Sequence, residues 1–466
     1  MNKAAHQVVV IGAGFGGLEC TRALSRAGVH VTVIDRRNHH LFQPLLYQVA
    51  TAALTPADIA YPIRAALSKY ENIRVLLAEV KSIDVGARTV ELDGGSLQYD
   101  YLVVATGATH SYFGKDQWET LAPGLKSVED AVEIRRRILV AYEAAERESD
   151  AQAQRDWLTF VVVGGGPTGV ELAGALGEIG LHTLSKAFRS INTRDVRVVL
   201  FEGRDRVLNT YPEKLSAAAK ESLEKRHVEV RLDTMVTSID EHGVTVKGPA
   251  GEDRVAARTV LWAAGVAASP LARSLGAPLD RSGRVIVEPD LSIPGHPEVF
   301  VIGDLAKMIS DGAEVPGVAQ GALQGGTYVA KIIETEVEQR LDGGPSDARP
   351  PRKAFHYRDK GNMATIGRAE AVIATKHFAK HGLLAWMLWW VVHIFFLVGF
   401  RNRVYMLAHW AWSWLTYRRG SRLITGEVGT LPPVETIAAD GTVALPVQAA
   451  PVEITEKKPA PASPSA

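Results

Sequence analysis

The chain has 466 residues, enough for two or three domains with buried cores, and 46% of them are hydrophobic, as in an ordinary globular protein. Its 52 basic and 52 acidic side chains give a formal net charge of zero, so nothing indicates a nucleic-acid partner. The 14 His show no metal-ligand spacing, and a single cysteine, Cys20, can form neither an internal disulfide nor a metal cluster alone. We therefore predict no metal site. The first strand begins without a charged and then apolar leader, so we expect no export signal and a cytoplasmic catalytic domain.

The first predicted elements are an apolar strand over residues 7–11, a glycine-rich turn, a helix, and a second strand over 29–34 that ends in Asp35. This order, with the spacing Gly-x-Gly-x-x-Gly, is typical of a dinucleotide-binding βαβ unit. The glycines permit a tight turn and a close approach of the backbone to a pyrophosphate, while Asp35 would accept hydrogen bonds from the ribose hydroxyls. We assign the whole turn to a nucleotide cofactor: Gly12, Ala13, Gly14, Phe15, Gly16 and Gly17.

The next segment, residues 36–48, has no helical or strand period, and Pro44 argues against a continuous helix. The residues alone fit a loop that lines a flavin and a plain connection about equally. Predicted strands follow over 73–80 and, as a hairpin, over 90–92 and 97–99.

A buried strand over 101–105 ends in the small residues Thr106 and Gly107, where the chain could pass close to a cofactor. A charged amphipathic helix is predicted over 130–148.

The opening unit then recurs, with a strand over 158–163 and the glycines Gly164, Gly166 and Gly169. The following strand, 196–201, ends in Glu202. Because the gap to this acid exceeds the usual spacing of about 20 residues, we expect the helical region to extend through 181–188. Two such units in one chain predict two bound nucleotides.

Short antiparallel strands are predicted over 228–230, 236–239 and 244–246. A strand over 260–263 then ends in Ala264 and Gly265, which repeats the small-residue exit of the first unit.

A further buried strand, 299–302, ends in Gly303 and Asp304. The carboxylate suits the hydroxyls of a flavin, with helix capping as the alternative. A helix begins within 316–326 and carries Gln320 and Gln324 on one face. Its N-terminus would stabilise negative charge on a reduced flavin, although amides on a helix are often only surface residues.

The character of the chain changes at residues 383–400, which carry no formal charge. As a helix this stretch would reach about 27 Å, which is marginal for a hydrocarbon core of about 30 Å. Six of the nine Trp fall between Trp386 and Trp414, residues 403–415 have helical apolar spacing, and arginines crowd the far side. We favour an interfacial membrane anchor. A buried helix with a dimer interface and a true membrane span are the alternatives, and the tail from about residue 435 is predicted to be disordered.

These motifs together resemble the two-dinucleotide-binding-domain flavoproteins, and within them the type II NADH dehydrogenases, which are non-pumping NADH:quinone oxidoreductases. The resemblance covers nearly all of residues 7–420 and includes the Trp-rich end. Besides the first glycine turn, it rests on Phe42–Gln48, Gly164–Ala173, Trp262–Gly265, Gly303-Asp304, Ala319–Gln324 and Asp359–Gly361.

The resemblance implies an α/β fold with two Rossmann-like dinucleotide-binding domains, small antiparallel insertions and a C-terminal membrane-associating helical region. The expected domains are an FAD-binding domain in two parts (1–120 and 285–380), an inserted NADH-binding domain (121–284), the anchor (381–425) and the tail (435–466). It also implies catalytic positions at Glu171, near the flavin–nicotinamide junction, and at Gln320 and Gln324 in a quinone site. The remaining expected cofactor contacts are Arg36, Gln43, Val80, Thr106, Gly107, Ala264, Gly265, Gly303, Asp304, Ala319 and Lys360.

The implied reaction passes a hydride from NADH to FAD and then two electrons to a membrane quinone, ubiquinone or menaquinone, without proton pumping and with protons from water or Glu171. Glu202 favours NADH, because a carboxylate repels the 2′-phosphate of NADPH. The implied location is the cytoplasmic face of the inner membrane, and a homodimer is compatible with it. Sulfide:quinone oxidoreductases and disulfide reductases need at least two cysteines, and this chain has only Cys20, so we do not favour either class. The alternatives that stay open are a flavin-based redox sensor or scaffold and another flavin-dependent NAD(P)H reductase.

Overall fold

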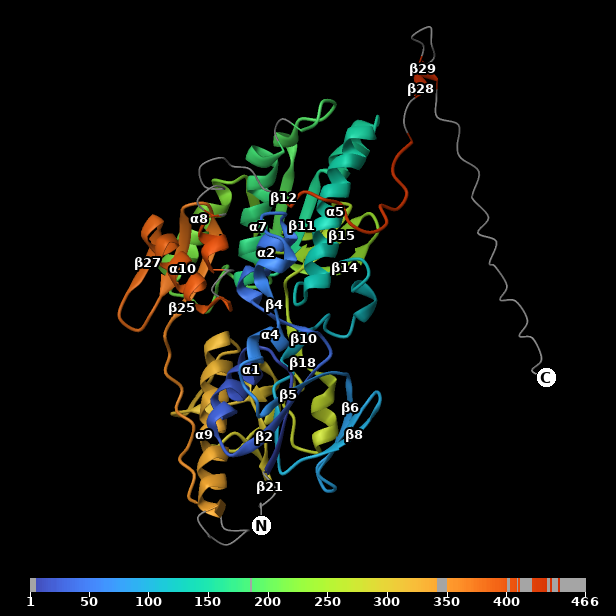
Figure 1. Ribbon diagram of the computed structural model, residues 1–466. Coiled ribbons are helices and arrows are strands. Elements are labelled where there is room, and N and C mark those ends of the chain that lie inside the picture. The colour runs from blue at the N-terminus through green and yellow to red at the C-terminus, as the bar shows by residue number, and fades with distance from the viewer. Residues whose placement is uncertain are drawn as a thin grey trace, which may run out of the picture.

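The computed structural model describes residues 6–184, 187–341, 350–399, 403–408, 410, 421–433, 436–437 and 443–444. Figure 1 shows two lobes, one above the other, each built around a parallel sheet. This confirms the predicted α/β class.

The first sheet has six strands in the order β20-β21-β9-β1-β2-β5. All its neighbours pair in parallel except β20, which runs antiparallel to β21. Strands β1 and β9 carry the buried apolar runs Val8–Ile11 and Tyr101–Val104, as expected when helices cover a parallel sheet. The bounds are β1 His6–Ile11, β2 Val29–Asp35, β5 Ile73–Leu77, β9 Tyr101–Val104, β20 Ser292–Ile293 and β21 His296–Val301, with helices α1 Phe15–Ala23 and α9 Ala319–Leu341.

The second sheet has four strands in the order β13-β12-β11-β17, all parallel. The prediction that residues 228–230 form an antiparallel strand is wrong, because β13 pairs in parallel with β12. The physical reason is α8, a helix between these two strands that returns the chain to the starting end of the sheet. The bounds are β11 Thr159–Val163, α7 Pro167–Glu178, β12 Arg197–Phe201, α8 Glu213–Glu224, β13 Val228–Arg231 and β17 Thr259–Trp262.

Each lobe also contains a small antiparallel sheet of three strands. The predicted hairpin at 90–99 is confirmed as β7 and β8, with β6 as a third strand, and the predicted strands at 236–239 and 244–246 are confirmed as β14 and β15, with β16 beside them. The predicted strand 73–80 is in fact two strands, because β5 ends at Leu77 and β6 starts at Val80. The bounds are β6 Val80–Asp84, β7 Thr89–Leu92, β8 Gly95–Gln98, β14 Met235–Asp240, β15 Gly243–Gly248 and β16 Gly251–Ala256.

Two short strands connect the lobes. β10 (Ala108–His110) leaves the first sheet, β18 (Val266–Ala268) leaves the second, and they pair antiparallel with Ala108 opposite Ala268. In Figure 1 this pair lies between the two sheets.

Helix α5 (Val128–Arg147) confirms the helix predicted over 130–148. Ser127 and Asp130 cap its N-terminus reciprocally, which satisfies backbone donors that a helix start would otherwise leave open. After α7 the chain forms one turn of π-helix, η4 (Ile179–Thr183), so the predicted extension through 181–188 is confirmed only to residue 183; residues 185–186 lie outside the described part.

The C-terminal part begins with the sheet β25 (Asn362–Gly367), β26 (Glu370–Ala374) and β27 (Ala379–Gly382), followed directly by α10 (Leu383–Phe396). α10 has 14 residues and spans about 21 Å. None of the helices in the described ranges combines the length and apolar character that a membrane crossing requires.

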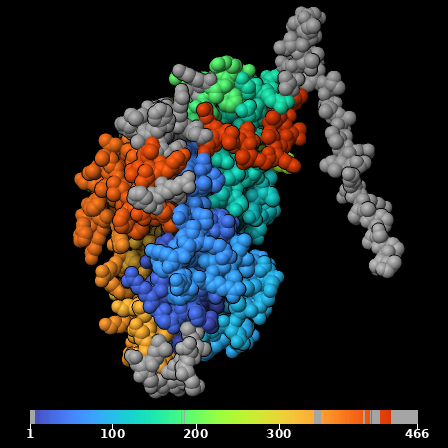
Figure 2. Space-filling view, in the orientation of Figure 1, coloured from blue at the N-terminus to red at the C-terminus, as the bar shows by residue number. Residues whose placement is uncertain are grey.

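Residues 403–408 are also helical, while 411–420, with part of the predicted second helix and its arginines, lie outside the described residues. Within the tail predicted to be disordered, β28 (Thr436–Ile437) pairs with β29 (Val443–Ala444), and the rest of that tail is not described. In Figure 2 the segment 421–433, coloured red, lies across the surface formed by α5. There Arg136 Nη1 donates to the carbonyl of Glu427 at 2.9 Å.

The remaining short elements are η1 Leu24–Arg26, β3 His39–Leu41, η2 Gln43–Leu45, α2 Leu46–Ala50, α3 Pro56–Ile59, β4 Ala60–Pro62, α4 Ile63–Leu67, η3 Asp116–Trp118, α6 Ala151–Trp157, η5 Thr193–Asp195, η6 Pro270–Leu275, β19 Val285–Ile286, η7 Gly303–Leu305, β22 Ala306–Lys307, β23 Ile309–Ser310 and β24 Ala313–Glu314.

A buried polar network holds the far end of α9 against the first sheet. Glu336, 1% exposed, accepts a hydrogen bond from the Tyr101 hydroxyl at 2.7 Å and another from Arg352 Nε at 2.7 Å. Arg352 also binds Asp290 at 2.8 Å. Burial strengthens such an ion pair and makes the loss of either partner costly.

We predict that Arg352→Ala lowers the free energy of unfolding by about 3–5 kcal/mol, because Glu336 would stay buried without its counter-charge. The matched control is Arg254→Ala, whose partner Asp240 lies 2.7 Å away at the surface; this change should cost no more than about 1 kcal/mol. Urea unfolding followed by circular dichroism measures both. Similar midpoints for the two variants would contradict the prediction.

Candidate functional site

The first glycine turn is a place where two stretches of backbone touch. Gly12 has a φ of +94°, and a Cβ on it would lie 2.5 Å from the carbonyl oxygen of Ala105. A Cβ on Gly17 would lie 1.8 Å from the carbonyl oxygen of Gly12. Both positions therefore exclude any side chain, which confirms the tight turn and the close helix–strand packing expected from the sequence.

Asp35 fixes this turn from the end of β2. One oxygen of its carboxylate accepts from the amide of Ala13 at 2.7 Å, and the other accepts from the amide of Arg37 at 2.8 Å. His40 also makes a hydrogen bond with this loop, because its Nδ1 lies 2.9 Å from the carbonyl oxygen of Ala13. Burial lowers the pKa of His40 to about 4, so this imidazole is neutral.

The N-terminus of α1 is open. Gly14 precedes the helix, no side chain caps it, and nothing lies within 4 Å of where its Cβ would be. The first amides of a helix lack partners within the helix, and together with the helix dipole they suit a phosphate. The structure thus has the shape that a pyrophosphate requires.

Helix α9 runs beside α1 in the same direction. A Cβ on Gly16 would lie 3.1 Å from the carbonyl oxygen of Ala322, and one on Gly326 would lie 2.4 Å from that of Gly16. The two helices thus start at the same end of the sheet, and their positive dipole ends point to one region. Close by, the buried hydroxyl of Thr106 has no hydrogen-bond partner among the described residues.

The second glycine turn repeats this construction. Gly164 has a φ of +108° and its Cβ would lie 2.8 Å from the backbone of Ala263, while a Cβ on Gly169 would lie 1.8 Å from the Gly164 oxygen. Glu202 takes the place of Asp35 and accepts from the amides of Gly165 at 2.6 Å and Arg204 at 2.9 Å. Nothing lies within 4 Å of a Cβ on Gly166, which precedes an α7 without a side-chain cap.

The small-residue exits lie after β9 and β17, where Gly107 and Gly265 have φ angles of +68° and +78°. Here the sequence reasoning missed Phe113, which is 70% exposed with a φ of +53°. Its ring would lie 2.6 Å from a Cβ on Gly265 and makes an edge contact with Trp262, with centroids 6.2 Å apart. Nothing in the sequence around an aromatic residue indicates a left-handed backbone.

Glu171 lies on α7 where this helix packs against β25. A Cβ on Gly174 would lie 1.8 Å from the carbonyl oxygen of Ile366, so the two elements approach backbone to backbone. Burial raises the pKa of Glu171 to about 8, and a hydrogen bond from the backbone of Thr365 opposes this shift. Burial and the nearby Glu171 also raise the pKa of Tyr211. At neutral pH the Glu171 carboxyl is therefore mostly protonated.

The two glutamines at the start of α9 have different surroundings. The Gln324 amide donates to the carbonyl of Arg358 at 3.0 Å and accepts from its amide at 2.9 Å, so it holds the segment that leads to Lys360. The Gln320 side chain, one turn earlier, makes no hydrogen bond with any residue that the structure describes. Ala319 is the first residue of α9.

The other predicted contacts belong to both lobes. Asp304, in the turn η7 that starts at Gly303, lies 3.5 Å from where a Cβ on Gly317 would be. Arg36 and Gln43 are exposed. Val80 is the first residue of β6, and two residues before it the amide of Ala78 donates to the carbonyl of Asp35 at 3.1 Å. Lys360 is exposed, and Ala264 lies between β17 and β18.

A line of rings joins the first glycine turn to α10. Phe15 makes an edge contact with Phe42 at 5.8 Å between centroids, and Phe42 makes one with His393 at 6.1 Å. His393 stacks on Trp389 at 4.1 Å, which in turn lies 5.6 Å from Trp410. Burial lowers the pKa of His393 to about 4, which leaves it neutral as a packing residue. The C-terminal helix is thus part of the core.

Within the described part of the chain, no group of three His, Cys, Asp or Glu side chains is placed to hold a metal ion. Cys20 is buried, and burial raises the pKa of its thiol to about 12, so it is not a reactive thiolate.

Comparison with known proteins agrees with this geometry. Residues 6–326 match the family model described as pyridine nucleotide-disulphide oxidoreductase. The chain is 48% identical to the type II NADH:quinone oxidoreductase NdhA of Mycobacterium tuberculosis over 91% of this chain and 90% of that protein, and 46% identical to Ndh of the same organism over 91% of each. The solved structure of NDH2 from Plasmodium falciparum in complex with NADH has a TM-score of 0.79 at 19% identity and covers 88% of this chain and 98% of that one, which shows the fold alone.

The raised pKa of Glu171 predicts a pH-dependent stability. Above pH 4.5, the carboxyl's ordinary pKa, the unfolded chain loses the proton while the folded protein keeps it up to about pH 8. The unfolded state then binds fewer protons, so stability falls as the pH rises through this window. Each pKa unit is worth about 1.4 kcal/mol, so the loss amounts to a few kcal/mol.

Urea unfolding at pH 5 and pH 8.5 measures this loss. Glu171→Gln should remove most of the decline, while the exposed Glu71→Gln should retain it. An identical decline in the wild type and in Glu171→Gln would contradict the assignment.

Proposed function

Since the chain belongs to the pyridine nucleotide-disulphide oxidoreductase family and to the type II NADH:quinone oxidoreductases, we propose that it oxidises NADH and reduces a membrane quinone through a bound FAD. One observation carries this proposal. The chain holds two glycine turns of the same build, each with an open helix N-terminus and a carboxylate at the next strand end. Two turns of this kind suit two dinucleotides.

We assign FAD to the first turn. Two helix N-termini, those of α1 and α9, point to this region, and the orphaned hydroxyl of Thr106 offers a partner to a bound group. Asp304 lies where it could accept from the hydroxyls of the flavin chain. When bound, FAD would supply the redox chemistry, accepting two electrons from NADH and passing them to the quinone.

We assign NADH to the second turn. Glu202 holds its carboxylate against the amide of Gly165, next to where an adenosine ribose would lie, and a negative charge there disfavours a 2′-phosphate. Phe113 and Gly265 offer an apolar surface beside the same sheet edge. The strained backbone of Phe113 fits a residue placed to contact a ligand.

Glu171 would hold the proton that quinone reduction needs. Its raised pKa keeps this half-buried carboxyl protonated at neutral pH, as a general acid requires. For the quinone itself we propose contact with Gln320, whose amide is not engaged by the described residues. Gln324 instead positions the segment around Arg358.

The exposed face of α10 supports a role at a membrane surface. Leu384, Met387, Val391 and Phe395 lie three or four positions apart and are each at least half exposed, while Trp389 on the other face is 1% exposed. Such an apolar stripe on a short helix is typical of interfacial binding. It would place the quinone-side opening at the lipid surface.

The disulfide chemistry in the name of the family does not fit this chain. A disulfide cycle needs two thiols, and here there is only the buried Cys20. A redox sensor without sustained turnover remains the second hypothesis, and slow reoxidation of the reduced protein by every quinone would favour it.

The assignment of the two turns predicts different losses for equivalent glycines. Gly17→Ala should lower flavin affinity by at least about tenfold, or about 1.4 kcal/mol, because the new Cβ cannot fit beside Gly12. Gly169→Ala should keep the flavin and raise the NADH concentration needed for its reduction by a similar factor. Flavin absorbance after purification and NADH titration of that absorbance measure the two effects.

Gly94→Ala, in an open hairpin turn, is the matched control and should change neither quantity. Retained flavin in Gly17→Ala, or unchanged NADH titration in Gly169→Ala, would overturn the assignment.

The membrane role can be tested without cutting into the core. The triple variant Leu384→Gln, Val391→Gln, Phe395→Gln should weaken binding to lipid vesicles by at least about tenfold, since burying one large apolar side chain is worth roughly 1.5–3 kcal/mol. Reduction of a long-tailed quinone should fall more than reduction of ferricyanide. Ile309→Gln, an exposed apolar residue on β23, is the control. An equal loss with both acceptors would argue for a purely structural helix.

A further inference from the structure

Charge is unevenly distributed along the C-terminal part of the chain. The whole sequence carries equal numbers of basic and acidic side chains, yet no Asp or Glu occurs between Glu370 and Glu427. Seven basic side chains fall in this interval: Lys376, Lys380, Arg401, Arg403, Arg418, Arg419 and Arg422. This stretch, which includes α10, therefore has no acidic side chain of its own to neutralise its positive charge.

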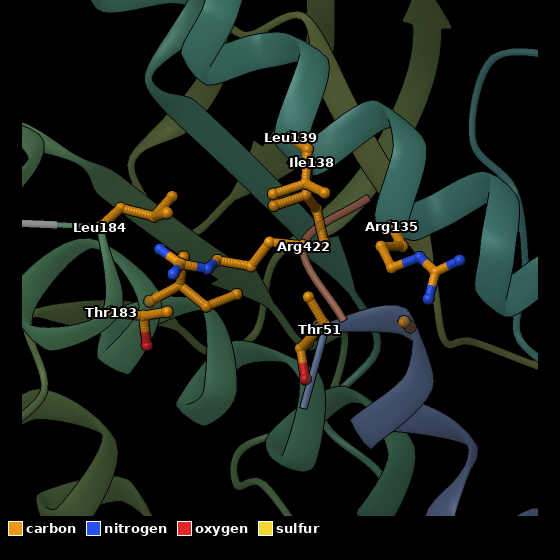
Figure 3. A pocket seen from close by; sticks show the side chains of 10 residues that line it. Thr51, Arg135, Ile138, Leu139, Thr183, Leu184 and Arg422 are labelled. Carbon is orange, nitrogen blue, oxygen red and sulfur yellow. The ribbon is translucent and has the colours of Figure 1, made fainter. Parts of the chain in front are cut away.

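Only some of these cations lie beside α10. Arg422 lines a small pocket with Ile138 of α5 and Thr183 of η4, and Figure 3 shows its side chain extending toward Thr183 and Leu184. Residues 401, 418 and 419 lie outside the described part of the chain. The cations to consider are therefore Lys376 and Lys380, on the hairpin of β26 and β27, and Arg403.

The hairpin runs directly into α10. β26 pairs antiparallel with β27, and Gly382, the last residue of β27, is followed by Leu383, the first residue of the helix. In Figure 1 the hairpin and α10, both orange, lie together on one flank of the molecule. Lys380 thus lies only four positions before Leu384, where the exposed apolar stripe of α10 begins.

The tip of the hairpin is held by its own hydrogen bonds. The amide of Thr375 donates to the carbonyl of Phe378 at 2.8 Å, and the Thr375 hydroxyl accepts from the amides of His377 at 3.2 Å and Phe378 at 3.1 Å. Phe378 is 42% exposed and lies in sequence between the exposed Lys376 and Lys380. Neither lysine has a hydrogen-bond or ion-pair partner among the described residues. An exposed ring between free cations is typical of a contact with lipid headgroups.

The other end of the stripe also has a cation. The guanidinium carbon of Arg403 lies 6.0 Å from the ring centre of Phe395, and its Nε donates to the carbonyl of Leu397 at 2.8 Å. Because α10 spans about 21 Å, positive charge lies beside both ends of its apolar stripe. A helix that lies along a membrane surface brings both ends to the headgroups, as this arrangement requires.

Acidic side chains of neighbouring elements do not cancel this charge. α8 packs against the hairpin and carries Glu221, but this carboxylate is paired with Lys225 of the same helix at 2.7 Å. Glu370 is the first residue of β26, at the end of the strand away from the tip. A second copy of the chain would fit this surface poorly, because a symmetric contact would set the same cations against each other.

We propose that the hairpin of β26 and β27 is a second membrane contact beside α10 and that it selects anionic phospholipids. Lys376 and Lys380 would bind the headgroups, and Phe378 would insert between them. The proposal rests on the membrane role proposed for α10, whose stripe supplies the apolar part of the binding. The hairpin and Arg403 add the electrostatic part, since each basic side chain near an anionic leaflet raises the affinity several-fold.

Sedimentation of the full-length protein with lipid vesicles tests this selectivity. Wild type should bind vesicles of phosphatidylcholine with phosphatidylglycerol at least about tenfold more tightly than pure phosphatidylcholine. This preference should shrink as the salt concentration is raised, because ions screen exposed charges. The double variant Lys376→Gln, Lys380→Gln should lose at least about fivefold of the preference, while its binding to pure phosphatidylcholine changes little.

The double variant Lys69→Gln, Lys247→Gln is the matched control, because it removes the same charge from two exposed lysines elsewhere on the molecule. It should keep the wild-type preference, and an equal loss in both double variants would overturn the assignment to the hairpin. Phe378→Ser should weaken binding to both kinds of vesicle several-fold, since it removes an inserted apolar side chain. Unchanged binding by this variant would overturn the insertion of the ring.

The outcomes for wild type separate this inference from the proposed function, because no measurement uses NADH or quinone. Equal affinity for both kinds of vesicle would overturn the lipid selectivity and leave the membrane role of α10 intact. Binding to neither kind would overturn both. A dimer in analytical ultracentrifugation that the Leu384, Val391 and Phe395 triple variant dissociates, without any vesicle binding, would assign this surface to a second copy and overturn the proposal.

Discussion

The contact between two backbones at each glycine turn is the constraint on which the rest of the structure depends. Gly17 rests on Gly12, and Gly169 rests on Gly164, at distances where a single methyl group would overlap a carbonyl oxygen. This contact brings each helix start against the end of its sheet, and the following acid then fixes the loop through its amides. The geometry that we propose for phosphate binding is thus a result of packing among the described residues.

The C-terminal helix depends on the same region. Because Phe15, Phe42, His393 and Trp389 follow one another in contact, the first glycine turn and α10 share one continuous core. Trp410 extends this line by donating from Nε1 to the amide oxygen of Gln48 at 3.0 Å. The inward face of α10 provides the packing that holds this helix in place. The apolar side chains on its outward face are therefore not needed for the stability of the fold.

Much of this structure could be predicted from the sequence. Glycines at fixed spacing, with a strand before and an acid after, predict two tight turns, and the close backbone contacts of both turns are confirmed. The parallel pairing of β13 was missed, since the short segment Val228-Glu229-Val230 carries no signal for strand direction and only the crossover helix decides it. Gln324 was predicted as a site residue from a motif, yet its partner lies 34 residues further along the chain.

The paired strands β10 and β18 have a consequence for how such a chain can arise. Ala108 and Ala268 face each other, so the 159 residues between them leave and re-enter the first lobe at almost the same point. A domain whose two ends meet in this way can be grafted into a host loop with little added entropy of loop closure. The architecture is therefore open to the exchange of one nucleotide module for another during evolution, with the host sheet left unbroken.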